Sequence, residues 1–512
     1  MVKVFSKYSI YILLAIAACS CDFKDKGNFL LEPISNINID TTGIPLQRSI
    51  PRDSVLIIDP LVSREGVAES NFNYQWYMTL KPGADFNNAR IISNEKKLSV
   101  PMEVNPSTDY YSIWFKVTDK TTGLKSGIVW QVVVQPPTNQ GLVIADSDDG
   151  LSSDLSVVQD TLFTTNWFEK GTTTAKATVY KRNEFSNVNG RKITGLMHSL
   201  FAQRLYYNGL NTNFLHGASK NNAFRISTLD YKMIAEGNQL FYDASVNLNI
   251  DYYFLNGSTN PWMMNAGKVS NRIIETSSFV GIRKFSIEVP GNYKANRAIA
   301  VHPTINQNAI FYDENLGRFL RFGTSLNVKA APFESTTETT PFAANNLPGY
   351  TALGGGLGGD LSEARFVLKK GAYYGVFCLT YTGSPRRVID ISSAPDIANA
   401  VSFVFPSDQA VIYYATANKV YSIRIPQGGS PSYSDLYTSP DPITMLEMVR
   451  RSGTLDVTYS ERCLLAVTYN GSEGKVTALP IPADGLGLGT IDLTRKAIFG
   501  GFKKISAVAI QE

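Results

Sequence analysis

The chain has 512 residues, of which 44% are hydrophobic and 18% charged, so it is long enough to bury more than one hydrophobic core. Lysine and arginine total 48 against 44 acidic residues, and only three histidines and four cysteines are present. A charge this close to neutral gives no electrostatic reason to expect nucleic acid or another polyanion as a partner.

Residues 1–18 have the pattern of a lipoprotein signal peptide. Lys3 and Lys7 precede an uncharged apolar run, Tyr8–Ala18, that is too short to anchor the chain across a bilayer. The aliphatic and small residues before Cys19 fit a bacterial lipobox, in which the cysteine thiol receives a diacylglyceryl group. Acyl chains contribute about 0.8 kcal/mol per buried methylene, which makes such an anchor durable. We predict lipidation of Cys19, with Cys21 as the alternative.

Residues 19–40 are expected to be an extended tether, and residues 41–136 a β-sandwich. Trp76 lies in the alternating run "NFNYQWYMTL", where an immunoglobulin-like sandwich has a buried tryptophan. The segment "DYYSIWFKVTDKTTGLKSGIVWQVVV" reads as two strands joined by a polar turn. Pro136 and Pro137 then mark a linker.

Residues 138–512 contain recurring apolar hairpins such as "AVIYYATANKVYSIRI" and "CLLAVTYNGSEGKVTALPI". Each has an apolar strand, a polar turn and a second strand, as in the meander of a propeller blade. At roughly 40–50 residues per blade, this length predicts an all-β chain with a β-propeller of about seven blades. Six or eight blades remain open, and a pair of sandwiches or jelly rolls is the alternative.

Few patterns indicate a cofactor or a metal. Gly354-x-Gly356-x-x-Gly359 nominally matches a dinucleotide fingerprint, which functions only at a turn from a strand to a helix. Here the motif lies in a Ser/Thr/Gly-rich segment, residues 334–360, which is expected to be a surface loop. "DSDDG", from Asp146, has glycine where a calcium loop needs its third ligand, so a hairpin turn is favoured. No histidine pair has ligand spacing, and no cofactor, metal or catalytic residue is predicted.

Aromatic residues beside asparagine and glycine are the best candidates for ligand contacts. Flat rings and amides suit sugars or peptide backbones, although aromatics in blades more often pack the core. Trp262, which follows Asn260 and Pro261, is expected to lie exposed in a loop. The candidate ligand contacts are Trp262, Tyr252, Tyr253, Tyr206 and Tyr373.

Several short motifs, in their order along the chain, resemble the PKD-like family of Bacteroidota surface lipoproteins. They are "DKGN" at Asp25–Asn28, "YQWY", "FKVTDKTTG", "GLVIADSDDG" and the C-terminal "GFKKISAVAI". The resemblance implies a PKD/immunoglobulin-like sandwich and a cell-surface accessory role beside a TonB-dependent transporter and its lid lipoprotein. It supplies no catalytic residues.

These observations together lead us to expect a lipid-anchored protein on the outer-membrane surface. It would bind a nutrient ligand, either a glycan or a peptide, or dock on the transporter complex, without catalysis. Two alternatives stay open. One is a propeller-type glycoside hydrolase or polysaccharide lyase, because paired carboxylates have no local spacing rule and meet only in the fold. The other is a purely structural subunit of the transporter assembly.

Overall fold

The computed structural model describes residues 35–511 except 53, 81–88, 105–108, 136–139, 165–166, 170–171, 208–209, 229, 258–259, 272–283, 303–307, 324–329, 334–340, 360–362, 381 and 451–460. The predicted lipidation sites, Cys19 and Cys21, lie outside these residues. The chain divides into two compact units, with the main boundary between Val132 and Val133. Almost all regular structure is β, as predicted, and no helix in the described part is long and apolar enough to cross a membrane.

The first unit consists of three sheets. A five-stranded sheet has the order β2-β9-β8-β5-β6, and two two-stranded sheets pair β1 with β4 and β3 with β7. Their bounds are β1 Asn38–Asp40, β2 Gln47–Pro51, β3 Val55–Ile58, β4 Leu61–Ser63, β5 Phe72–Leu80, β6 Arg90–Ser93, β7 Leu98–Pro101, β8 Tyr111–Asp119 and β9 Lys125–Gln135, with a 3-10 turn at Glu69–Asn71.

Alternating side chains give each sheet of the first unit one buried face. On β3, Leu56 and Ile58 are buried whereas the residues between and before them are exposed. Trp76 on β5 is fully buried, as predicted, and its ring lies 4.2 Å from that of Phe115 and 5.5 Å from that of Trp130. Its indole nitrogen donates to the carbonyl oxygen of Glu95 at 2.8 Å. One face of the five-stranded sheet therefore packs around a satisfied tryptophan.

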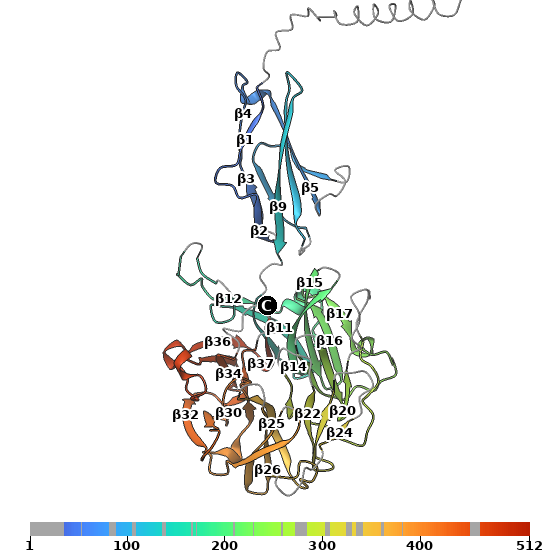
Figure 1. Ribbon diagram of the computed structural model, residues 1–512, viewed down its shortest axis with the longest axis vertical. Helices are drawn as coiled ribbons and strands as arrows, with labels where there is room; N and C mark the ends of the chain where they lie inside the picture. Colours follow the sequence, from blue (N-terminus) through green and yellow to red (C-terminus); the bar gives the residue numbers. More distant parts are fainter. Residues whose placement is uncertain are drawn as a thin grey trace, which may run out of the picture. The chain divides into compact units, whose positions relative to one another are not determined.

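Seven sheets follow one another in the described part of the second unit (Figure 1). Each has its strands in consecutive antiparallel order except the first, which also takes the last strand of the chain. The first sheet contains β10 Gly141–Ser147, β11 Ser152–Gln159, β12 Val179–Lys181, β13 Ile193–Thr194 and β37 Lys504–Gln511, the second β14 Met197–Tyr207, β15 Leu210–Ser219, β16 Asn222–Ser227 and β17 Met233–Glu236, and the third β18 Ile250–Asn256, β19 Asn260–Asn265 and β20 Lys268–Asn271. The fourth contains β21 Ile299–Ala300, β22 Ala309–Asp313, β23 Arg318–Phe322 and β24 Ala331–Pro332, and the fifth β25 Thr351–Gly358, β26 Glu363–Lys370, β27 Tyr373–Thr380 and β28 Pro385–Asp390. The sixth contains β29 Ser402–Val404, β30 Val411–Ala415, β31 Lys419–Arg424 and β32 Ser432–Thr438, and the seventh β33 Ile443–Met448, β34 Cys463–Tyr469, β35 Gly474–Pro480 and β36 Ala497–Phe502.

Helical structure is confined to short connections. The single α-helix of the described part is α2, Glu184–Asn189, and 3-10 turns lie at Gly237–Leu240, Ile397–Asn399, Ala483–Gly485 and Leu493–Arg495. Turns of two to four residues join most strands within a sheet, as a β-meander requires. The hairpin after β10 contains Asp149, whose carboxylate accepts hydrogen bonds from the amides of Leu151 and Ser152, both at 2.7 Å. "DSDDG" is therefore a turn, as predicted.

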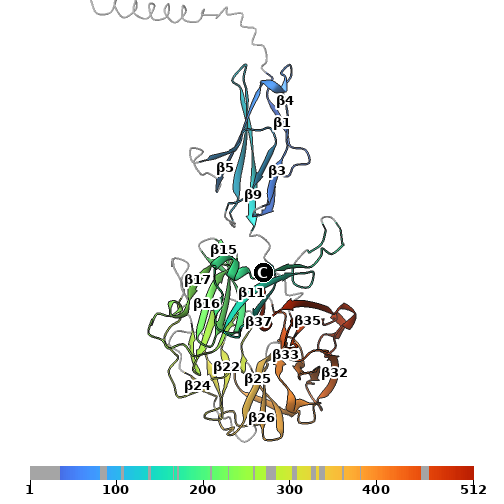
Figure 2. The same cartoon turned by 180° about the vertical axis from the view of Figure 1, so that it is seen from behind.

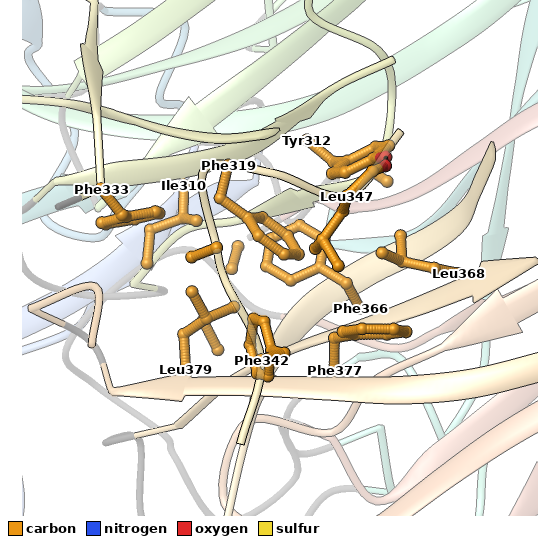
Figure 3. Packing of buried hydrophobic residues seen from close by; sticks show 14 of the residues in the cluster. Ile310, Tyr312, Phe319, Phe333, Phe342, Leu347, Phe366, Leu368, Phe377 and Leu379 are labelled. Atoms are coloured by element: carbon orange, nitrogen blue, oxygen red, sulfur yellow. Dashed lines mark hydrogen bonds between the residues drawn. The ribbon is translucent and has the colours of Figure 1, made fainter. Parts of the chain in front are cut away.

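The core of the second unit consists of layers between neighbouring sheets, and these layers close a ring. A separate cluster of buried apolar residues joins each sheet to the next, and the last cluster joins the seventh sheet, through Leu465 and Val467, to the first, through Leu142 and Ile144. Figure 3 shows the layer between the fourth and fifth sheets, in which aromatic rings such as those of Phe319 and Phe366 interdigitate. A closed ring of antiparallel sheets is a β-propeller.

The C-terminal strand closes the ring. β37 pairs antiparallel with β10 along its length, although more than 350 residues separate the two in sequence. Tyr231 of the second sheet donates from its hydroxyl to the side chain of Gln511 at 2.7 Å, which ties the last residues to a neighbouring blade. Figure 2 shows the C-terminus beside β11, next to the first strands of the ring. Loss of the last strand would therefore open the ring and expose two buried layers.

Candidate functional site

The strand nearest to the axis of the ring is the first strand of each sheet, except in the first sheet, where it is β37. β14 contacts β37 and β18, and β21, β25, β29 and β33 contact one another in series. Because the sheets repeat one topology, these strands run in the same direction, so residues at matching positions lie at similar depth. Polar side chains on or beside these strands, although distant in sequence, are the candidate site.

Tyr252, the third residue of β18, is half-buried at this position. Its ring lies 5.4 Å from that of Phe254, and the guanidinium of Arg297 lies 5.9 Å from the Tyr252 ring centroid. The Arg297 side chain is oriented by its Nε, which donates to the carbonyl oxygen of Asp251 at 2.7 Å. The Tyr252 hydroxyl makes no hydrogen bond with the described residues. The phenol is therefore fixed by ring contacts while its oxygen stays available.

Charged groups from another sheet act on the same phenol. Burial raises the pKa of Tyr252 above its ordinary value, the carboxylate of Glu447 raises that pKa further, and Arg450 and Arg297 lower it. Glu447 is the fifth residue of β33, in the seventh sheet. Tyr252 itself lies on β18, in the third sheet.

Glu447 is exposed to solvent, although protein atoms also lie around its carboxyl group. Its side chain is exposed, yet surrounding protein raises the pKa of the carboxyl group, an effect that Arg450 and the Met448 amide oppose. Arg450 itself is committed elsewhere, because it pairs with Glu461 at 3.2 Å and donates to the Phe405 carbonyl at 2.8 Å. Glu447 forms no salt bridge with the described residues. We call Tyr252, Arg297 and Glu447 the axial group.

Two nearby groups that could add acid–base chemistry are committed to the fold. Asp251 accepts hydrogen bonds from the Lys220 amine at 2.8 Å and from the Gly267 amide at 2.6 Å. His198 donates from Nε2 to the carbonyl of Ile250 at 3.2 Å, and burial, aided by Arg297, lowers its pKa to about 4. Glycoside hydrolysis requires two carboxyl groups that act together. Asp251 cannot serve as the second one beside Glu447, because its oxygens are already held by Lys220 and Gly267. The axial group can donate and accept hydrogen bonds, but it is not a recognisable acid–base pair.

The predicted ligand contacts do not gather in one place. Tyr252 belongs to the axial group, whereas Tyr373 begins β27 and packs beside Tyr350 with ring centroids 6.4 Å apart. Tyr253 is buried, and its hydroxyl lies 2.6 Å from Nδ1 of His216. Tyr206 lies on β14, but its side chain is outside the described residues.

The prediction that Trp262 lies exposed in a loop is wrong. It is on β19, the middle strand of its sheet, and is fully buried in the layer between the third and fourth sheets. Asn260 and Pro261 suggested a loop, yet both lie within the strand, where Asn260 pairs with Asn256 and Pro261 with Leu255. Because Trp262 is a core residue, it cannot contact a ligand without unfolding its blade.

The glycine-rich segment is also not a loop throughout. Gly354, Gly355 and Gly356 lie within β25, the first strand of the fifth sheet. A Cβ added at Gly356 would lie 2.5 Å from Cβ of Phe405, and one added at Gly354 would lie 3.0 Å from Cβ of Phe403. The glycines therefore allow β25 to approach the segment of Phe403 and Phe405 closely, and the described part of the glycine-rich segment contains no helix at which a dinucleotide would bind.

The remaining chemical candidates are structural. Cys378 and Cys463 are free and buried, and burial raises the pKa of each thiol to about 12, so neither is reactive near neutral pH. No group of three potential metal-ligating side chains occurs among the described residues. Arg297 and Glu447 were missed because neither belongs to a local motif; Arg297 precedes β21 and contacts Tyr252 of another sheet, and Glu447 lies on β33.

Comparison with known proteins supports the resemblance noted in the sequence. Residues 21–196 match the model of the PKD-like family. The match includes the first unit and the start of the propeller. No curated protein matches.

Solved structures give only distant likenesses. A quinoprotein alcohol dehydrogenase-like protein from Bacteroides thetaiotaomicron is 10% identical with a TM-score of 0.40, covering 93% of this chain and 99% of its own. A protein from Lactobacillus plantarum is 10% identical with a TM-score of 0.45, covering 73% and 99%. A streptogramin B lyase is 12% identical with a TM-score of 0.37, covering 60% and 83%. No functional inference follows from likenesses this distant.

Proposed function

We propose that this protein is a lipid-anchored lipoprotein of the outer-membrane surface that captures a nutrient ligand without catalysis. In this proposal the first unit is a PKD/immunoglobulin-like spacer, and the seven sheets of the second unit are the blades of a seven-bladed propeller that binds the ligand. The match of residues 21–196 to the PKD-like family and the lipobox before Cys19 support the location. A TonB-dependent transporter and its lid lipoprotein would be the partners that receive the ligand.

The observation that carries the binding role is the axial group. Tyr252, Arg297 and Glu447 offer hydrogen-bonding atoms that the described residues do not use, while the adjacent Asp251 and His198 are committed to the fold. Such a set can hold a polar ligand, and it contains no second carboxylate free to complete a hydrolytic pair. Binding and presentation therefore fit the residues better than turnover.

Two experiments test this proposal. Glycan and peptide arrays probed with the chain from residue 22 onward should reveal a bound class, and chromatography of the same ligands after incubation should show no products. Product formation would instead favour the hydrolase or lyase alternative. Mass spectrometry of the mature N-terminus should find acylated Cys19, or Cys21 if the second frame is used; an unmodified N-terminus would contradict the anchor. Co-purification with the transporter and no affinity for any ligand would favour the purely structural role.

A further inference from the structure

The hairpin of β10 and β11 brings two buried carboxyl groups to directly opposite positions. Asp146 and Asp154 are Cα partners in the antiparallel register, and they are 9% and 4% exposed. Side chains directly opposite one another in an antiparallel pair lie on the same face of the sheet, with Cβ atoms about 4.5–5.5 Å apart. On this face Ile144, two residues before Asp146, packs into the layer between the first and seventh sheets. Two acidic groups therefore meet at the edge of an apolar layer.

The hydrogen bonds of this pair leave one carboxylate oxygen without a partner. Oδ2 of Asp146 accepts from the backbone amide of Lys503 at 2.8 Å. Oδ1 of Asp154 accepts from the amides of Leu155 at 2.8 Å and Ser186 at 3.1 Å. Oδ2 of Asp154 is buried and accepts no hydrogen bond. Because buried polar atoms in folded proteins are almost always hydrogen-bonded, this oxygen requires a donor.

The surrounding cations do not supply that donor. No lysine or arginine among the described residues forms an ion pair with Asp146 or Asp154. Arg182, directly after β12, stacks its guanidinium 3.9 Å from the ring centroid of Phe502, a residue of the same layer, and donates to the Gly500 carbonyl at 2.7 Å. Calcium takes about six to eight oxygen ligands, and the described residues offer no group of three potential metal-ligating side chains. A protonated carboxyl group, in contrast, has one O–H that can donate.

We propose that Asp146 retains a proton and donates it to Oδ2 of Asp154, so that the two carboxyl groups together hold one negative charge. The proton comes from solvent, and the O–H bond of Asp146 is the only covalent bond that forms. Lys503, whose amide binds the same Asp146 carboxyl group, immediately precedes β37, the strand that closes the ring. The shared proton therefore lies at the closure of the propeller. This inference goes beyond the proposed function and does not depend on any ligand.

The charges around the pair favour the protonated form of Asp146. Burial raises the pKa of Asp146 above its ordinary value, and the carboxylates of Asp154 and Asp148 raise it further. The Lys503 amide and the Arg182 guanidinium lower that pKa and only partly offset the increase. Other charged side chains on the adjoining elements are those of Asp149, Glu184, Lys192, Lys503 and Lys504.

The pair makes the stability of the propeller depend on pH. Because the folded chain binds this proton more tightly than the unfolded chain, its contribution to stability is complete below the ordinary carboxyl pKa of about 3.9. The contribution is lost as the pH rises through the raised pKa of Asp146. Above that pH two negative charges oppose each other beside β37. Asp148 has the opposite effect, because its hydrogen bond with Lys192 lowers its pKa.

Infrared difference spectroscopy on the chain from residue 22 onward tests the inference, because a protonated carboxyl group has its own C=O stretching band. The variants are Asp146→Asn and Asp154→Asn, in which an amide N–H can replace the O–H of the pair with little change in shape. Asp148→Asn is the matched control, since Asp148 belongs to the same hairpin but is exposed and pairs with Lys192 at 2.6 Å. Thermal unfolding of each variant checks that the fold is retained, and urea unfolding measures the dependence of stability on pH.

At about pH 5.5 a carboxyl group of ordinary pKa is ionised. We expect the wild type to keep a carboxyl C=O band at this pH that both pair variants lack and that Asp148→Asn retains. The unfolding equilibrium constant of the wild type, relative to that of Asp146→Asn, should rise about fivefold between about pH 3.5 and pH 8, which equals about 1 kcal/mol.

Three results would overturn the shared proton. They are a C=O band that survives in Asp146→Asn, a ratio of unfolding constants that does not change with pH, and stabilisation of the wild type by calcium chloride that Asp146→Asn abolishes. The last result would assign the pair to a cation instead. Each measurement is made without a ligand, so none of these results bears on the proposed function.

Discussion

β25 lies so close to Phe405 that a side chain at Gly356 should destabilise the propeller by an amount that can be measured. The Gly356→Ala substitution would place a Cβ 2.5 Å from Cβ and 3.0 Å from Cγ of Phe405, a side chain only 4% exposed. Real Cβ contacts are essentially never that short, and both atoms belong to inner elements of the ring, so a backbone must move. Forcing extra volume into a packed region costs about 1–3 kcal/mol.

Thermal unfolding measures this cost. With an unfolding entropy of about 2.1 cal/mol/K per residue, a propeller of about 380 residues changes stability by about 0.8 kcal/mol per degree, so Gly356→Ala should lower the propeller's Tm by about 1–4 °C. Gly428→Ala is the matched control, because a Cβ there meets nothing within 4 Å and the backbone is not left-handed. That control should be neutral or slightly stabilising. Equal melting temperatures for the two variants would refute the explanation that close packing requires glycine at position 356.

Four further substitutions probe charge, core packing and pH dependence. Glu363→Gln removes the carboxylate that lies 2.8 Å from Arg365, a side chain only 1% exposed, and should lower the free energy of unfolding in urea by about 3–5 kcal/mol. Asp435→Asn breaks an exposed ion pair and should lower it by about 0–1 kcal/mol. Equal losses for the two variants would contradict the claim that burial makes the first pair important. Trp262→Leu should lower stability by several kcal/mol, and a neutral result would show that the ring is not in the core. Burial lowers the pKa of His198 to about 4, so its contribution to stability is complete above about pH 6.5 and is lost as the pH falls from 6.5 to 4. His198→Asn should make the free energy of unfolding fall less over this range. An unchanged dependence of the unfolding free energy on pH would contradict this prediction.

The sequence predicts the elements whose signal is local. Alternation of apolar and polar residues located the strands around Trp76, and apolar hairpins with polar turns predicted a propeller in the second half of the chain. The free thiols were also predictable, because Cys378 and Cys463 lie in continuous apolar runs typical of buried strands. In each case neighbours in sequence determine the environment.

The features that the sequence did not predict depend on contacts between sheets. Asn260 and Pro261 indicate a loop by propensity, but packing of Trp262 against the fourth sheet outweighs that preference. Consecutive glycines likewise indicate a loop until the approach of Phe405 to Gly356 is known. The contact between Tyr252 and Arg297 has no motif either, since 45 residues separate the two and only the packing of neighbouring sheets brings them together.

Capture without turnover is the central claim, and one titration tests it directly. The chain from residue 22 onward would be titrated with the tightest-binding ligand from the arrays, and the same sample would then be separated by size and analysed for products. We expect saturable binding with one site per chain and a ligand that is recovered unchanged. Cleavage of the ligand in the same sample would contradict capture without turnover and identify the protein as an enzyme.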